Sequence, residues 1–186
     1  MTMTLPPRRL LILSCSATKR PGPKYMPAID RYDGPLWQTL RTVDPDGRLA
    51  QVAFLSAHLG FRAASTPIEL YDARMSRERA EAMKAGGLGT RWPPPRTQRR
   101  VMPSGEHPGM HIASMSRFGR EPFEDVALVG GHLYLDVMCH FAVIFRERGH
   151  ITADARITEI NGEIGRMRQK LRLWLLRPLN DAGSQP

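Results

Sequence analysis

The chain has 186 residues, 41% of them hydrophobic, which is enough for one hydrophobic core and too few for two. Its 27 Lys and Arg exceed its 18 Asp and Glu, and the formal net charge of +9 favours a polyanionic partner, nucleic acid before membrane. No apolar run approaches the length of about 18 residues that spans a bilayer, and no secretory signal is recognisable. We therefore expect a cytoplasmic protein without membrane contact.

The clearest pattern lies near the start of the chain. Residues 10–13 are continuously apolar and lead into Ser14-Cys15-Ser16-Ala17-Thr18-Lys19. Such a run is typical of a buried parallel strand, and α/β sheets bind ligands at the carboxyl ends of their strands. We therefore expect chemistry near Cys15, Ser16 and Lys19. Cys15 fits both a nucleophile activated by Lys19 and an inert cysteine at a strand end.

The loop after this strand matches neither of two common phosphate loops. A phosphotyrosine phosphatase loop needs an arginine where this chain has Pro21, and a Walker loop needs two glycines that are missing here. A hydroxyl-rich turn with one lysine could still bind a phosphate or a carboxylate.

The next segments predict alternating helices and strands. A helix is predicted over residues 35–43, because Pro35 suits a first helical turn. Residues 51–57 read as a second buried strand that also ends on small residues. A short segment at 68–72 precedes a predicted helix over 76–85, which begins at a capping serine and ends at a Gly-Gly pair.

Residues 86–109 are rich in proline and arginine and predict a long insertion with little regular structure. This loop is either a functional lid or an insertion without a role. In the first case, its arginines would contact nucleic-acid phosphates: Arg91, Arg96, Arg99 and Arg100.

A third buried strand is predicted over 125–129 and a helix over 132–148, with Gly130-Gly131 between them. Glycines between a strand and a helix let a ligand phosphate approach the helix N-terminus. A last helix is predicted over 153–176, because Ile157, Ile160 and Ile164 begin an apolar stripe at helical spacing. That stripe fits packing on its own domain or a homodimer seam, and the opposite basic face could follow a phosphate backbone.

Together these segments predict an α/β fold with three layers: a mostly parallel central sheet, helices on both faces and a long C-terminal amphipathic helix. We expect one domain over residues 1–150 with the insertion at about 86–109. The C-terminal helix would occupy 151–177, and a flexible tail 178–186.

Metal and cofactor chemistry is not indicated. The six histidines are scattered, and none pairs with a cysteine at zinc-finger spacing, so we expect no metal site and no cofactor. Cys15 and Cys139 lie in unlike contexts, which predicts reduced thiols. His58, just past the second strand, is either an acid/base candidate or an ordinary surface histidine.

Several motifs together resemble a known group of domains. In order they are Ser-Cys-Ser-x-x-Lys, Tyr-x-x-Pro-Leu-Trp, Leu-Ser-Ala-x-x-Gly and Pro-x-x-x-Tyr-Asp. This order resembles an uncharacterised bacterial and phage domain family that is similar to the YaaA peroxide-stress proteins and to the lysine-transfer domain of archaeosine synthase. The resemblance covers residues 10–72 well and 126–134 loosely. Where the family has Leu-Ser-Ala-Lys-Tyr-Gly, this chain has His58 and Leu59.

The resemblance implies an α/β domain connected with nucleic acid or a modified nucleobase. The matching positions are Cys15, Ser16, Lys19, Tyr32, Ser56, Tyr71, Asp72 and Tyr134. Among them we expect Cys15, Lys19 and Asp72 to be catalytic, with Asp72 either an acid/base group or a sugar or base ligand. Tyr32 or Tyr71 would stack on a base or hydrogen-bond to it. The expected substrate-binding residues are Ser14, Ser16, Tyr32, Ser56, Tyr71, Gly130, Gly131 and Tyr134.

The first functional hypothesis is a nucleic-acid-associated enzyme that acts on a nucleobase or a glycosidic bond. The second is a DNA- or RNA-binding protein without catalysis, in a stress response or a mobile element. The third is an enzyme acting on a small nucleotide, with an incidental basic surface. All three predict a nucleic acid, DNA or tRNA, or a nucleotide as the partner.

Overall fold

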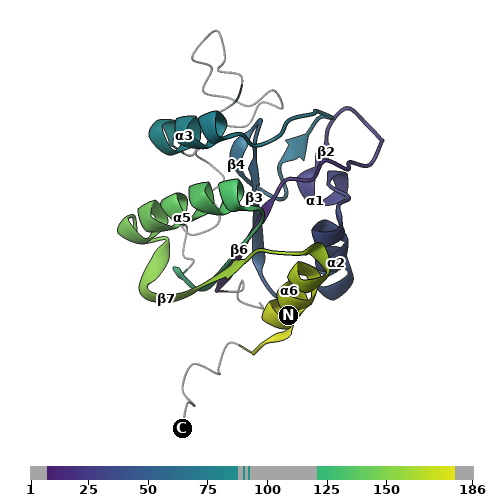
Figure 1. Cartoon of the computed structure of the whole chain (residues 1–186). Coiled ribbons are helices and arrows are strands. Elements are labelled where there is room, and N and C mark those ends of the chain that lie inside the picture. The colour runs from purple at the N-terminus through teal and green to yellow at the C-terminus, as the bar shows by residue number, and fades with distance from the viewer. Residues whose placement is uncertain (1–7, 88–89, 91, 93–120, 179–186) are drawn as a thin grey trace.

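The computed structural model describes residues 8–87, 90, 92 and 121–178, and its core is one five-stranded sheet (Figure 1). The strand order is β4-β3-β1-β6-β7. Only β4 runs antiparallel, to its neighbour β3; the other three pairings are parallel. The α/β fold with a mostly parallel sheet is therefore confirmed. The strands are β1 (Arg9–Ser14), β3 (Gln51–Ser56), β4 (Gly60–Ala63), β6 (Phe123–Val129) and β7 (Ile151–Ile160).

Helices cover both faces of the sheet (Figure 1). On one face lie α1 (Ala28–Arg31), α2 (Pro35–Val43) and α6 (Ile164–Leu176), and on the other α3 (Arg77–Gly86) and α5 (His132–Glu147). The short strands β2 (Met26–Pro27) and β5 (Pro67–Ile68) form a separate antiparallel pair.

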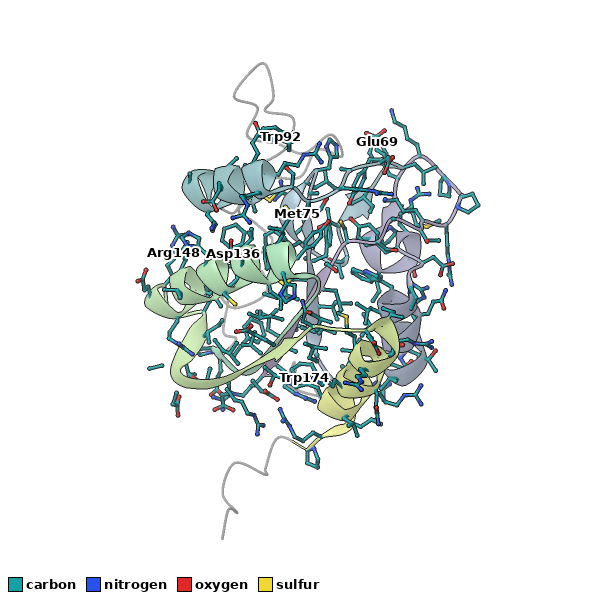
Figure 2. The ribbon with its side chains drawn as sticks, viewed as in Figure 1. Glu69, Met75, Trp92, Asp136, Arg148 and Trp174 are labelled. Carbon is teal, nitrogen blue, oxygen red and sulfur yellow. The ribbon has the colours of Figure 1, made fainter. Side chains whose placement is uncertain are left out.

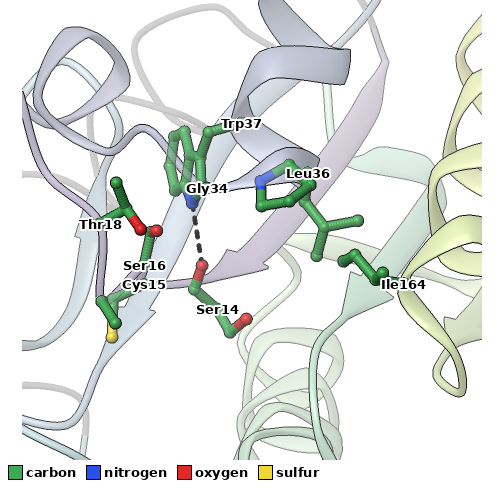
Figure 3. A pocket seen from close by; sticks show the side chains of 10 residues that line it. Ser14, Cys15, Ser16, Thr18, Gly34, Leu36, Trp37 and Ile164 are labelled. Atoms are coloured by element: carbon green, nitrogen blue, oxygen red, sulfur yellow. Dashed lines mark hydrogen bonds between the residues drawn. The ribbon is translucent and has the colours of Figure 1, made fainter.

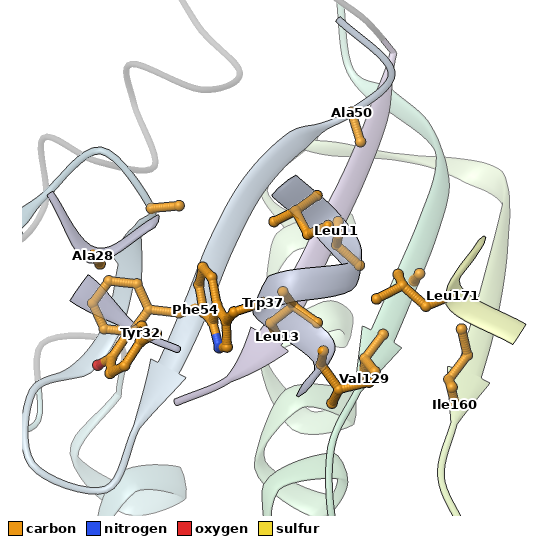
Figure 4. Packing of buried hydrophobic residues seen from close by; sticks show 14 of the residues in the cluster. Leu11, Leu13, Ala28, Tyr32, Trp37, Ala50, Phe54, Val129, Ile160 and Leu171 are labelled. Carbon is orange, nitrogen blue, oxygen red and sulfur yellow. The ribbon is translucent and has the colours of Figure 1, made fainter. Parts of the chain in front are cut away.

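The central strand β1 contributes side chains to two hydrophobic clusters, because its side chains alternate between the two faces of the sheet. Leu11 and Leu13 pack with Trp37 and Leu171 beneath α2 and α6 (Figure 4). Leu10 and Ile12 pack toward α5 on the other face. A strand that is apolar on both sides is thus fully covered, as the continuous run at 10–13 predicts.

Two predicted helices have the predicted ends. α2 spans residues 35–43 with Pro35 at its start. α3 follows Ser76, whose side chain accepts a hydrogen bond from the Arg79 amide at 3.2 Å, and it ends at Gly87, where φ is 79°. The capping residues therefore fix both ends of α3.

The predicted helix over 153–176 is wrong in its first half. Residues 151–160 form the edge strand β7, parallel to β6, and α6 begins only at Ile164. The intervening Gly162 has φ 120°, a conformation that breaks a helix. Ile157 and Ile160 belong to the sheet, so the α/β domain continues past residue 150. The predicted tail, beyond residue 178, and most of the 86–109 insertion lie outside the described residues.

The chain turns in opposite directions from the two central strands. From β1 it passes through α1 and α2 to β3, and from β6 through α5 to β7, so the two connections use opposite faces. The carboxyl ends of β1 and β6 therefore form the switch point of the sheet, where open α/β sheets bind ligands. Within the described residues, no helix is long and apolar enough to cross a membrane.

A buried charge cluster holds the other end of the sheet together. Asp125 on β6, 2% exposed, accepts hydrogen bonds from Arg9 Nε at 3.1 Å, Trp174 Nε1 at 3.2 Å and Arg177 at 3.0 Å. The Arg9 guanidinium stacks 4.0 Å from the ring of Trp174, which lies on α6 (labelled in Figure 2), and donates to the Leu175 carbonyl oxygen. Burial lowers the pKa of Arg9, and Asp125 opposes this.

We expect Asp125→Asn to lower the free energy of unfolding by about 3–5 kcal/mol, because removing one partner leaves buried guanidinium charge uncompensated. Urea unfolding followed by circular dichroism measures this change. Asp46→Asn is the matched control, since Asp46 contacts Arg48 at 3.8 Å on the surface, and its effect should stay within about 0.5 kcal/mol. Equal effects of the two variants would contradict the role of the cluster.

Candidate site at the carboxyl ends of β1 and β6

A pocket of about 290 Å³ opens where the chain leaves β1 (Figure 3). Its wall consists of the loop at residues 14–18, the start of α2 at 34–37 and Ile164 at the start of α6. Hydroxyl groups of Ser14, Ser16 and Thr18 and the thiol of Cys15 supply its polar side chains. The volume is at the small end of the range for small-molecule sites.

Backbone contacts hold this loop against its neighbours. The Trp37 indole donates to the Ser14 carbonyl oxygen at 3.0 Å, and the Cys15 amide donates to the Leu55 carbonyl oxygen at 2.9 Å. Gly34 lets α2 approach closely, because a Cβ there would lie 2.4 Å from Ser16 Oγ. The loop is therefore positioned by β3 and by the first turn of α2.

Two helices begin at this site without a capping side chain. The N-cap residues are Gly34 for α2 and Gly131 for α5, and neither has a side chain that could accept a hydrogen bond from the amides of the first turn. A Cβ on Gly130 would lie 3.0 Å from Ser14 Cβ, so the start of α5 is close to the same loop. Free amides and the positive ends of two helix dipoles suit an anionic group.

Lys19 supplies the cation of the site. Its Nζ lies 4.2 Å from the centre of the Tyr71 ring, and residue 19 pairs with residue 32 through an isolated backbone bridge. Burial lowers the pKa of Lys19, while electrostatic interactions with Cys15 and Asp72 oppose that shift. A half-buried ammonium of this kind releases its proton more readily than a surface lysine.

A group of hydrogen-bonded hydroxyls lies beside the Lys19 ammonium and extends into the core. Tyr71 hydrogen-bonds the Ser56 hydroxyl at 2.7 Å and also the Tyr32 hydroxyl, and Tyr134 on α5 lies 3.2 Å from the Cys15 sulfur. Burial raises the pKa of all three tyrosines, so each keeps its proton at neutral pH. The cluster of Cys15, Lys19, Ser56, Tyr71 and Tyr134 is therefore one connected group.

Of the eight predicted substrate-binding residues, Ser14 and Ser16 line the pocket and the other six do not. Two of those six are fully buried. Tyr32 and Ser56 are both 0% exposed, and the Tyr32 ring packs against Trp37 and Phe54, with centroids 4.9 and 5.3 Å away. Aromatic side chains already occupy the surroundings of Tyr32, so of the two tyrosines predicted to contact a base, Tyr71 is the less deeply buried one. Base contact by either tyrosine stays a prediction. Tyr32 and Ser56 both hold Tyr71.

The remaining predicted residues lie at several places. Ser14, Cys15 and Ser16 line the pocket, and Gly130 and Gly131 lie at the neighbouring start of α5. Asp72 is exposed and close enough to affect the charge of Lys19. His58 Nδ1 lies 2.5 Å from the Trp92 carbonyl oxygen, and its ring is 5.0 Å from that of Tyr71. Outside the described residues lie Arg91, Arg96, Arg99 and Arg100.

Sequence reasoning missed Thr18, Gly34, Trp37 and Ile164 as parts of the pocket. Gly34 and Trp37 belong to the Tyr-x-x-Pro-Leu-Trp motif, where only the tyrosine was assigned a role, so the motif itself contained the signal. No sequence pattern marked Ile164 as a pocket residue, because it fits the spacing of the apolar stripe of the predicted last helix.

No protein-family model matches this chain, and no curated protein or solved structure is significantly similar to it. In the part of the chain that the structure describes, no group of three His, Cys, Asp or Glu side chains gathers as a metal site. The chemistry of the site has to be argued from its own side chains.

We expect Gly130→Ser to destabilise the fold by about 1–3 kcal/mol, because the new Cβ would overlap Ser14 and Tyr134. The matched control is Gly131→Ser: a Cβ there meets nothing within 4 Å, and serine is a favoured N-cap residue. Denaturant unfolding should therefore show an unchanged or slightly more stable control. If both variants unfold alike, the close approach of α5 to the β1 loop is not a constraint.

Proposed function

We propose that this chain is an enzyme that binds a nucleotide, free or within a nucleic acid, in the pocket between the β1 loop and α2, and acts on its base or glycosidic bond. The observation that carries the proposal is the convergence of three polar features at the switch point of the sheet. These are the hydroxyl-rich loop at 14–18, two helix N-termini without side-chain caps, and the half-buried Lys19.

Binding of the phosphate follows from the helix ends. Pro35, the first residue of α2, has no backbone N–H, so the amides that need acceptors begin at Leu36 in α2 and at His132 in α5. The hydroxyls of Ser14, Ser16 and Thr18 can donate to the same anion. The net charge of +9 attracts such a ligand over longer distances. Apolar contacts from Leu36, Trp37 and Ile164 suit the uncharged part of the ligand.

Reaction requires groups that can move protons or attack carbon, and the site holds both kinds. The lowered pKa of Lys19 brings its ammonium nearer to the range of a general acid or base. Cys15 lines the pocket and can attack carbon through its sulfur. Asp72 is the exposed carboxylate beside Lys19 and is our candidate for a sugar or base contact.

A second candidate function is nucleic-acid binding without catalysis, and the surface of α6 favours it. The exposed basic residues of that helix are Arg166, Arg168, Lys170 and Arg172. The resemblance to the YaaA group supports a nucleic-acid partner in the same way. In this case, binding depends on α6 and is independent of the pocket.

We expect nucleoside monophosphates to raise the melting temperature of the protein, and Lys19→Met to weaken their binding about tenfold by removing one charge-assisted contact. Lys24→Met, an exposed lysine of the same loop region, is the matched control and should bind like the unchanged protein. Isothermal titration measures both affinities.

A polymer partner is tested with labelled single-stranded DNA, duplex DNA and tRNA over a salt series. If α6 lies along phosphates, replacing Arg166 and Lys170 by Gln should reduce the salt slope by about one for each lost contact. Polymer binding that Lys19→Met leaves unchanged would favour the second candidate. No binding of nucleotide or polymer at low salt would overturn both.

A further inference from the structure

Which hydroxyl donates and which accepts in the hydrogen bonds around Tyr71 follows from the contacts of Ser56. Ser56 Oγ accepts hydrogen bonds from the backbone amides of His58 and Leu59, each at 3.0 Å. A hydroxyl group can accept two hydrogen bonds and donate one. The Ser56 proton is therefore left for a tyrosine hydroxyl, and the one at hydrogen-bonding distance is that of Tyr71, 2.7 Å away.

Tyr32 is the second donor to Tyr71. Its hydroxyl is fully buried and contacts that of Tyr71. If Tyr71 donated to Tyr32 instead, the Tyr32 proton would need another acceptor. Among the described residues, its other hydroxyl neighbour is Ser56, whose two acceptor positions are already used. A buried donor without an acceptor is costly, so the Tyr32 proton points to Tyr71.

Tyr71 thus receives two hydrogen bonds, and its own proton points elsewhere. Burial is the main cause that raises the pKa of Tyr71, and the nearby Cys15 side chain raises it further. The Cys15 sulfur is therefore the acceptor that the structure offers to the Tyr71 proton.

Tyr134 approaches the same sulfur from α5. Its hydroxyl oxygen lies 3.2 Å from Cys15 Sγ. Burial raises the pKa of Tyr134 most, the bond to Cys15 raises it as well, and a hydrogen bond from the Met75 backbone lowers it. The Tyr134 oxygen thus has a backbone donor, and the Cys15 sulfur is the acceptor within reach of its proton. Two phenol hydroxyls therefore lie near the Cys15 sulfur.

We propose that Cys15 is the nucleophile of this site, that Tyr71 and Tyr134 donate hydrogen bonds to its sulfur, and that Ser56 and Tyr32 are positioning residues that fix the direction of the Tyr71 bond. Hydrogen bonds donated to sulfur stabilise the thiolate, which is the reactive form. The ammonium of Lys19, over the Tyr71 ring, adds positive charge beside it. The sulfur points away from the Ser16 hydroxyl (Figure 3), so attack and phosphate binding use different parts of the loop.

In the reaction, a sulfur electron pair forms a bond to an electrophilic carbon of the nucleotide. The bond from that carbon to the leaving group breaks, and the leaving group departs with that electron pair and takes a proton from the Lys19 ammonium. The identity of this carbon rests on the proposed function. The nucleophilic character of Cys15 does not, because it follows from groups of the protein alone.

The chain contains its own control thiol. Cys139 on α5 is also free and half-buried, and burial together with Glu159 raises its pKa to about 11. Iodoacetamide alkylates a thiolate by forming a sulfur–carbon bond with loss of iodide. Alkylation of the full-length folded protein near neutral pH, followed by peptide mass spectrometry, gives the rates of both cysteines in one sample.

We expect Cys15 to react at least about tenfold faster than Cys139, and the difference to vanish in urea. Tyr134→Phe and Tyr71→Phe should each slow Cys15 roughly tenfold, because each removes one hydrogen bond to the thiolate. Tyr32→Phe should slow it by a smaller factor, since it removes only a bond to Tyr71. The rate of Cys139 should stay unchanged in all three, and a variant that unfolds is recognised because its Cys139 reacts faster.

The inference is overturned if Cys15 reacts no faster than Cys139, or if both phenylalanine variants that fold leave its rate unchanged. Should every variant unfold, the comparison of Cys15 with Cys139 in the unchanged protein decides alone. A parallel sample with a nucleoside monophosphate separates this inference from the proposed function. Fast alkylation without protection by the nucleotide supports the nucleophile and counts against nucleotide binding.

Discussion

The parallel pairing of β1 with both β3 and β6 is the constraint on which the rest of the structure depends. Parallel strands end at the same edge of a sheet, so this pairing brings Ser14, Ser56 and Gly130 to one edge although they are far apart in sequence. The apolar faces of β1 then need a helix layer on each side. The same geometry that buries the strand therefore creates the pocket.

The two ends of the sheet have different tasks. At the amino end of β1 and β6, Arg9 and Asp125 link the strands to the last turn of α6. At the carboxyl end, polar groups are left with capacity to bind a ligand, as the two uncapped helices show. Stability and chemistry thus rest on separate residues, which allows variants of one set to be studied without loss of the other.

Local patterns of the sequence predicted much of this arrangement. The apolar run at 10–13, the proline at the start of α2 and the serine before α3 each place an element correctly, because each acts through neighbouring residues. The strand β7 was mistaken for helix, because Ile157 and Ile160 fit helical spacing and the pairing with β6 is a tertiary contact. β4 was missed for a similar reason, since a four-residue edge strand has little pattern of its own.

Sequence motifs predicted which residues form the site better than they predicted what each residue does there. Motifs indicated Cys15, Lys19, Ser56, Tyr71 and Tyr134, and the structure gathers them. That Tyr32 and Ser56 are buried supports of Tyr71 depends on the ring packing of Tyr32 and on the amides that Ser56 receives, which no sequence pattern contains. The order of hydrogen bonds likewise appears only when the neighbours of each hydroxyl are known.

The most direct test of the central claim is a crystal structure of the chain with a saturating nucleoside monophosphate. The account predicts the phosphate within hydrogen-bonding distance of the loop at 14–18 and of the Leu36 and Trp37 amides in the first turn of α2, with the sugar or base near the Cys15 sulfur. A ligand bound elsewhere, or a pocket filled only by water at saturation, would contradict the assignment of this edge of the sheet as the binding site.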